Sequence, residues 1–124
     1  DGGNLPATFN LASCYLGGSG VEINLHEAIR LYKIASDGGN LNATIFLAIF
    51  YGNGVGVEKN LYESFRLYKI ASDRGDLSST YNLARCYEHG SGVEKDLQEA
   101  IRLYKIASDG GHLDATKRLS SYPF

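Results

Sequence analysis

The sequence predicts an all-α fold in which pairs of helices stack into a solenoid. The string LYKIASD recurs at Leu31–Asp37, Leu67–Asp73 and Leu103–Asp109, always 36 residues apart. Each repeat carries two segments with helix start and stop signals, and no segment has the alternating pattern of a strand. A period of this length is typical of helical repeat proteins. Catalytic chemistry needs only one copy of its residues, so the recurrence indicates a structural unit.

Each repeat begins with an Asp, and three full repeats are followed by a half repeat. The repeats span 1–36, 37–72 and 73–108, and the half repeat spans 109–124. We take 1–124 as one repeat domain. The chain contains no Met and opens on DGGNL, a string found again at Asp37–Leu41. We therefore expect it to be a segment of a longer array.

The first helix of each repeat is predicted from a polar residue at its start and a glycine beyond its end. The start residues have short polar side chains suited to an N-cap and are Asn4, Asn40 and Asp76. The glycines are Gly18, Gly54 and Gly90. The predicted helices span 5–16, 41–51, 77–88 and 113–121. Leu5, Thr8, Leu11, Ala12 and Tyr15 share one face and recur in the second repeat, so we expect them in the core.

The second helix of each repeat opens with a capping box, in which the cap side chain and a later acid each bind a backbone N–H. The three boxes are Asn24 with Glu27, Asn60 with Glu63, and Asp96 with Glu99. The predicted helices span 25–36, 61–72 and 97–108, and a glycine follows each of them. In the first repeat the polar strip is narrow, formed by Glu27, Arg30 and Lys33. The wide apolar stripe predicts burial on more than one side, so we expect LYKIASD to be the inner wall between stacked repeats.

Two helices of this length cannot form a stable domain alone. Ordering each residue costs about 1–2 kcal/mol of backbone entropy. Each buried Leu, Ile or Tyr side chain returns only about 1.5–3 kcal/mol. We therefore expect neighbouring repeats to share one continuous core, as helical solenoids do.

The recurring residues resemble the Sel-1-like repeats, a family of αα-hairpin repeats related to the tetratricopeptide repeats. In the third repeat the matching residues are Leu83, Ala84, Tyr87, Gly90, Gly92, Val93, Asp96, Glu99, Ala100, Leu103, Tyr104, Ala107 and Gly111. The chain departs from the family pattern at Ala84, Leu103, Ile106 and Ser108, where the family has Gly, Trp, Lys and Ala. Each departure keeps a small or apolar residue. The resemblance implies a right-handed αα-hairpin solenoid that serves as an adaptor or scaffold.

Differences between the repeats mark a candidate binding face on the first helices. Repeat positions 6, 9, 13 and 16 change freely and lie on one side of the helix. The resemblance implies that this side lines the concave face of the solenoid. The candidate partner-binding residues are Phe9, Ser13, Leu16, Ile45, Ile49, Tyr81, Arg85 and Glu88. The alternative is that these positions vary because nothing constrains them.

Several other functions are disfavoured by composition and spacing. The net charge of −2 gives no basic surface for nucleic acid. No apolar run approaches the roughly 20 residues of a membrane-spanning helix, so membrane insertion is not expected. The glycine-rich stretch Gly90–Lys95 joins two helices and lacks the spacing of a phosphate-binding loop.

No metal, cofactor or catalytic centre is predicted. Cys14 and Cys86 lie two repeats apart, too far for a disulfide in a solenoid, so we expect small core side chains. The histidines fall at three different repeat positions, namely His26, His89 and His112, and form no metal-ligand pattern. No arrangement of acid, base and nucleophile is visible, so we expect no enzymatic activity.

The sequence thus predicts a scaffold that binds a peptide or protein segment on its concave face. A structural spacer that positions other domains of a larger protein, such as a kinase, is the first alternative. A module that self-associates through exposed repeat ends is the second. The partner, the compartment and the pathway stay open.

Overall fold

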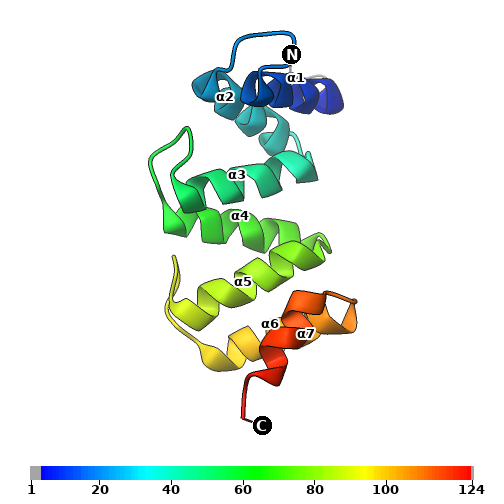
Figure 1. Cartoon of the computed structure of the whole chain (residues 1–124), viewed down its shortest axis with the longest axis vertical. Coiled ribbons are helices and arrows are strands. Elements are labelled where there is room, and N and C mark those ends of the chain that lie inside the picture. Colours follow the sequence, from blue (N-terminus) through cyan, green and yellow to red (C-terminus); the bar gives the residue numbers. More distant parts are fainter. Residues whose placement is uncertain (1–3, 124) are drawn as a thin grey trace. The chain divides into compact units, whose positions relative to one another are not determined.

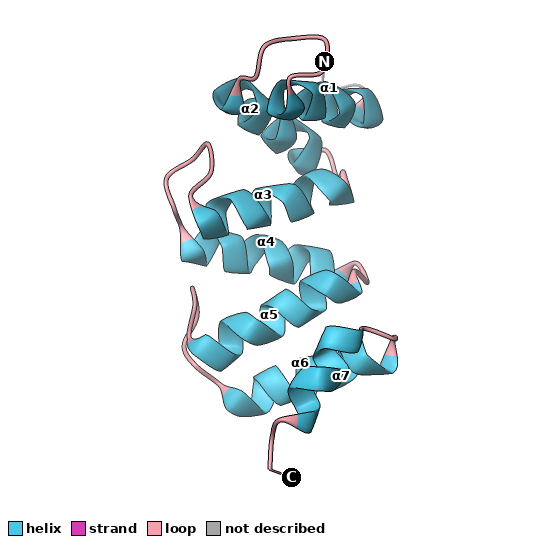
Figure 2. Ribbon diagram, viewed as in Figure 1, coloured by secondary structure: helices cyan, strands magenta, loops and turns pink. Residues whose placement is uncertain are grey.

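The computed structural model describes residues 4–123, and these form helices joined by short loops, without strands (Figures 1 and 2). The helices are α1 (Leu5–Gly17), α2 (Leu25–Asp37), α3 (Leu41–Asn53), α4 (Leu61–Asp73), α5 (Leu77–His89), α6 (Leu97–Asp109) and α7 (Leu113–Ser120). Each predicted helix is present, with ends shifted by at most two residues. The predicted all-α array of helical repeats is confirmed.

The chain divides into two compact units, residues 1–60 and 61–124. In the first unit, α2 packs against both α1 and α3. In the second unit, α5 packs against both α4 and α6, and α6 also contacts α7. Consecutive helices within a unit therefore share one hydrophobic core.

The helices are capped as predicted at Asn4, Asn24, Asn40, Asp76 and Asp96, but the capping boxes are incomplete. The Asn24 side chain accepts a hydrogen bond from the Glu27 N–H at 3.1 Å. The Glu27 carboxylate does not reach back, because it accepts two hydrogen bonds from Arg30 instead. The Asn24 N–H donates to the Tyr15 carbonyl oxygen at 2.9 Å, so it needs no acid. Asp96 and Glu99 repeat this arrangement in the second unit.

The first helices end in the left-handed conformation that glycine adopts without steric cost. Gly18, Gly54 and Gly90 have φ values of 72°, 69° and 70°. The N–H groups of Gly90 and Ser91 both donate to the carbonyl oxygen of Cys86, which has no partner within the helix end. These glycines therefore fix where the chain turns from the first helix into the loop.

The recurring tyrosine of LYKIASD anchors the core of each unit. Tyr32 and Tyr104 are both 0% exposed, and the neighbouring Leu and Ala of the string are buried with them. Ile70 and Ile106 are 39% and 43% exposed, so the isoleucine of the string contributes less to the inner wall than expected. Leu11 is 43% exposed, unlike its buried equivalents in α3 and α5. Among the described residues no helix precedes α1 to cover it.

A recurring pair of hydroxyl groups joins each second helix to the next first helix. Ser36 and Thr44 are hydrogen-bonded at 2.6 Å, and Ser72 and Thr80 repeat the contact at the same distance. Ser108 and Thr116 are hydrogen-bonded as well, at 2.5 Å. The serine of LYKIASD and the threonine eight residues later therefore recur because each satisfies the other in a partly buried contact.

Candidate functional site

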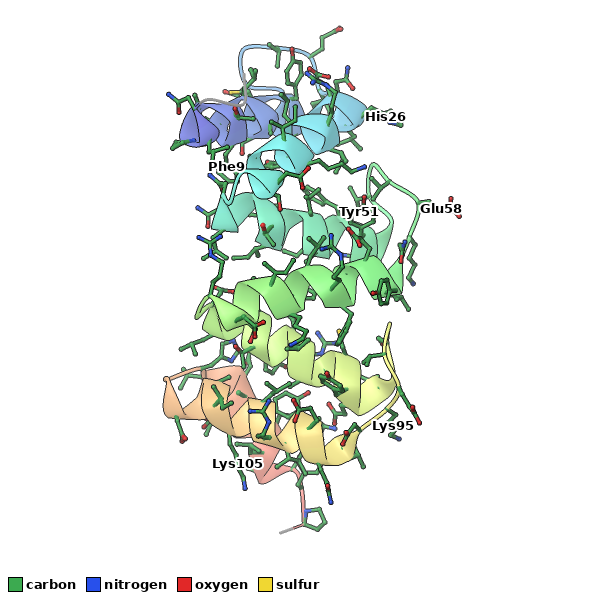
Figure 3. All side chains as sticks on the ribbon, turned by 180° about the vertical axis from the view of Figure 1, so that it is seen from behind. Phe9, His26, Tyr51, Glu58, Lys95 and Lys105 are labelled. Carbon is green, nitrogen blue, oxygen red and sulfur yellow. The ribbon has the colours of Figure 1, made fainter. Side chains whose placement is uncertain are left out.

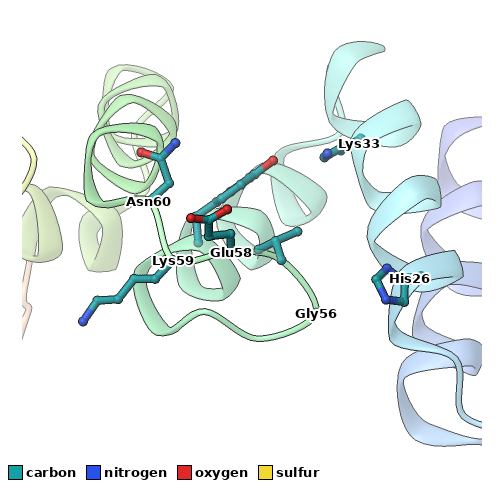
Figure 4. A pocket seen from close by; sticks show the side chains of 8 residues that line it. His26, Lys33, Gly56, Glu58, Lys59 and Asn60 are labelled. Atoms are coloured by element: carbon teal, nitrogen blue, oxygen red, sulfur yellow. The ribbon is translucent and has the colours of Figure 1, made fainter.

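The larger cavity of the first unit lies beside the loop that follows α3. Its volume is about 520 Å³, and its lining residues are His26, Lys33, Tyr51, Gly56, Val57, Glu58, Lys59 and Asn60. His26 and Lys33 come from α2 and face Glu58 across the opening, whereas Lys59 extends away from it (Figures 3 and 4). The Lys33 ammonium lies 5.8 Å from the centre of the Tyr51 ring, a cation–π distance.

This cavity offers no convergent chemistry. Its charged groups have both signs and belong to side chains with exposed ends. Between residues 4 and 123, no cluster of three His, Cys, Asp or Glu side chains could hold a metal ion. No helix in the same range is long and apolar enough to span a bilayer.

The candidate binding residues of the first unit differ in how far they are exposed. Phe9 is half-buried, with its ring centre 5.5 Å from Tyr32 and 5.4 Å from Phe46. Ser13 is also half-buried and is hydrogen-bonded to the Tyr32 hydroxyl at 2.9 Å. Leu16 and Ile45 are half-buried as well. Only Ile49 has a large exposed apolar surface, at 39%.

The candidate residues of the second unit lie on α5. Tyr81 stacks on the His112 ring at 4.7 Å and lies 5.6 Å from the Tyr104 ring. Arg85 is exposed, with its guanidinium carbon 6.0 Å from the centre of the Tyr81 ring. The face of α5 therefore presents one guanidinium above an aromatic ring that is held in place from below.

Glu88 is not on the open face, where the sequence placed it. Its side chain is only 6% exposed, and its carboxylate accepts hydrogen bonds from Tyr104, Tyr122 and Arg118. Burial of a carboxylate is tolerated only with such partners, because an unpaired buried charge is costly. Glu88 thus belongs to a buried network that ties α7 to α5.

A smaller cavity, which sequence reasoning missed, lies where α5 packs against α4. Its volume is about 140 Å³, and its lining residues are Tyr68, Asn82, Arg85, Cys86, His89 and Ser91. Of these only Arg85 was a candidate. The sequence did contain one indication of this cavity. In the third repeat, Arg85 and His89 replace the Ser13 and Gly17 of the first repeat.

Burial raises the pKa of two groups in this smaller cavity. It raises the pKa of the Tyr68 phenol to about 12, although the nearby Arg85 guanidinium acts in the opposite direction. It also raises the pKa of the Cys86 thiol. At neutral pH Tyr68 therefore keeps its proton and can donate it in a hydrogen bond, while Cys86 stays a thiol and is a poor nucleophile. Cys14 and Cys86 are both free.

Tandem pairs of helices with a 36-residue period define a helical repeat protein, and comparison with known families identifies which kind. The Sel1 repeat model matches residues 5–40, 41–76 and 77–112. The chain therefore belongs to the Sel1 repeat family, as the residue pattern indicated. The matched repeats begin at the first residue of each first helix, four residues after the Asp at which we divided the chain.

Three solved structures with the same fold are of bacterial proteins. The Sel1 repeat protein of Oxalobacter formigenes is 39% identical with a TM-score of 0.89, covering 97% of this chain and 90% of that one. The c5321 protective antigen of uropathogenic Escherichia coli, which displays an SLR fold, is 29% identical with a TM-score of 0.88, covering 93% and 25%. Helicobacter pylori cysteine-rich protein B is 25% identical with a TM-score of 0.74, covering 96% and 100%. A search of curated protein sequences found no match.

Membership in this family defines the general role of the chain. Sel1 repeat proteins are generally protein–protein interaction modules, and the family scaffold is typically non-catalytic.

Proposed function

We propose that this chain is a non-enzymatic scaffold that binds a peptide or protein segment with the exposed faces of its first helices. The observation that carries the proposal is the contrast between constant and variable repeat positions. The constant positions have structural contacts, such as the paired hydroxyls of Ser36 and Thr44. At position 13, in contrast, α3 exposes an isoleucine, Ile49, and α5 exposes an arginine, Arg85.

Arg85 has the chemistry in which binding energy concentrates, and Ile49 adds exposed apolar area. Binding hot spots are enriched in aromatic residues and arginine at desolvated positions. Burying Ile49 beneath a partner removes apolar area from water, which favours association. Arg85 adds a directional donor that a hydrophobic surface lacks.

The half-buried candidates would contribute mainly the edges of their side chains. Phe9 and Tyr81 pack against Tyr32 and Tyr104, the buried anchors of the two units. Replacing either with Ala would leave a cavity in an aromatic cluster and would lower stability as well as affinity. Ile49 is therefore the better position for a test of binding.

The test is a selection of binding peptides from a displayed random library on the immobilised chain. The affinity of a selected peptide is then measured for the wild type and for Ile49→Ser. The matched control is Ile70→Ser on the second helix α4, because Ile70 is also 39% exposed. We expect Ile49→Ser to weaken binding and Ile70→Ser to leave it unchanged.

Two outcomes would contradict the proposal. If no peptide is enriched, the spacer role replaces it, and sedimentation over a range of concentrations then tests self-association. If both substitutions weaken binding equally, the first-helix face is not the binding surface.

A further inference from the structure

We infer that the small cavity at the contact of α4 and α5 is a subsite for the carboxylate of an Asp or Glu side chain in a bound peptide segment. The inference deepens the proposed function and rests on it. It adds that the partner carries an acidic residue, which membership in the family does not indicate.

The lining of the cavity consists largely of hydrogen-bond donors. Arg85 contributes a guanidinium, His89 an imidazole, Asn82 an amide and Ser91 a hydroxyl group. Tyr68 contributes a phenol hydroxyl group, which is protonated at neutral pH. None of the lining residues is Asp or Glu. A carboxylate accepts hydrogen bonds at both oxygens and fits such a set.

Arg85 differs from the arginines of the second helices in its charge environment. Arg30, Arg66 and Arg102 each pair with a Glu three residues earlier. The residue three positions before Arg85 is Asn82, which also lines the cavity. Arg85 has no ion-pair partner among residues 4–123, so its positive charge is available to a ligand.

The acid beside His89, Glu88, does not cancel this charge. The Glu88 carboxylate lies 3.7 Å from the Nε2 atom of His89, but its side chain is only 6% exposed and forms an ion pair with Arg118. Its carboxylate also accepts hydrogen bonds from Tyr104 and Tyr122. The negative charge of Glu88 is therefore compensated by Arg118, and the positive charge of Arg85 remains available to a ligand.

The two cationic or ionisable donors of the cavity, Arg85 and His89, are not a recurring feature of the scaffold. The residues equivalent to Arg85 and His89 are Ser13 and Gly17 in α1, and Ile49 and Asn53 in α3. A residue required for packing recurs in this chain, as the LYKIASD string does. Because Arg85 and His89 occur in one repeat only, recognition explains these two residues better than packing, whereas Tyr68, Asn82 and Ser91 have equivalents in other repeats.

The size of the cavity agrees with a short acidic side chain. About 140 Å³ is several times the roughly 30 Å³ that one water molecule takes up in the liquid. A carboxylate with one or two methylene groups can enter while the peptide backbone stays outside. The Tyr81 ring beside Arg85 then offers an apolar contact to a neighbouring residue of the peptide.

Peptides are selected from the displayed library on three immobilised chains, the wild type, Arg85→Gln and Arg102→Gln, and the selected peptides are sequenced. The Arg102 variant is the matched control, because it removes the same charge from the same unit at a guanidinium that already has a partner, Glu99. We expect Asp and Glu to be enriched on the wild type and on the control, and not on Arg85→Gln. Replacing the selected acid with its amide should weaken binding to the wild type about tenfold or more.

His89→Gln is the second variant, and circular dichroism confirms that every variant keeps its helices. We expect His89→Gln to reduce the enrichment of acids, and Arg85→Lys to restore part of it. The subsite is overturned if the peptides selected on the wild type are not enriched in acids, or if both arginine variants lose the enrichment equally. Either result leaves the proposed function intact. If no chain enriches any peptide, the proposed function and the subsite fail together.

Discussion

The hydroxyl group of Tyr104 donates a 2.6 Å hydrogen bond to the carboxylate of Glu88, and both side chains are buried. Tyr32, which occupies the same repeat position, is hydrogen-bonded to the hydroxyl group of Ser13 at 2.9 Å instead. One recurring tyrosine thus has a charged partner in the second unit and a neutral partner in the first.

The two tyrosines should therefore differ in their contribution to stability. Tyr104→Phe removes a hydrogen bond to a charged group and should lower the free energy of unfolding by about 1.5–3 kcal/mol. Tyr32→Phe removes a neutral hydrogen bond and should cost about 0.5–1.5 kcal/mol. Urea denaturation measures both values. An equal loss in the two variants would contradict the assigned role of Glu88.

Glycine at repeat position 20 should have different importance in different repeats. Gly20 and Gly92 both have positive φ, of 78° and 74°, where a β-carbon costs roughly 1–2 kcal/mol. A β-carbon on Gly20 would meet open space, whereas one on Gly92 would overlap the backbone carbonyl group of Leu61. We expect Gly92→Ala to lower the free energy of unfolding by about 1–3 kcal/mol more than Gly20→Ala. Equal costs would show that the loop can move away from α4.

The N-cap of α2 should contribute measurably to stability although its capping box is incomplete. Asn24→Ala removes the acceptor for the Glu27 N–H and should cost about 1 kcal/mol. Asn10→Ala is the control, since Asn10 is an exposed residue inside α1. It should change stability by less than about 0.5 kcal/mol. Thermal unfolding followed by circular dichroism compares the two variants, and a harmless Asn24→Ala would show that the cap is dispensable.

Stability should fall in alkaline solution because of Tyr68. Burial raises the pKa of its phenol from 10.0 to about 12, so the folded chain keeps a proton that the unfolded chain loses. The contribution of Tyr68 to the free energy of unfolding is therefore constant below about pH 10 and decreases as the pH rises towards 12. Burial raises the pKa of Tyr104 as well, with the same sign.

Tyr68→Phe should make this alkaline decrease less steep. Urea denaturation of both chains at several pH values measures the slope, and the values at neutral pH provide the baseline for the substitution itself. Parallel slopes above about pH 10 would show that the Tyr68 phenol gains no extra protection from folding.

The helices were predictable because their start and stop signals are local. The hydrogen bond from the Glu27 N–H to Asn24 spans only three residues, so the sequence contains it directly. The hydrogen bond between Ser36 and Thr44 spans eight residues and joins two helices. The sequence showed only that a serine and a threonine recur at these positions. Thr8 was accordingly assigned to the core for its position rather than for its hydroxyl group.

The site was harder to predict because it depends on distant residues. Glu88 was placed on an open face by its position in the repeat, but Arg118 and Tyr122, which bury it, lie thirty or more residues later. The repeat pattern carries no information about these two residues, since they belong to the half repeat. The small cavity likewise needs Tyr68 from α4 beside Arg85 from α5.

The most direct test of the proposed binding face is a residue-resolved map of where a selected peptide binds. Amide chemical shifts of the isotope-labelled chain are recorded by nuclear magnetic resonance with and without the peptide. The account predicts that the largest changes lie on a first helix, either around Ile49 on α3 or around Arg85 on α5. Changes confined to the second helices, around exposed residues such as Ile70 and Ile106, would contradict it.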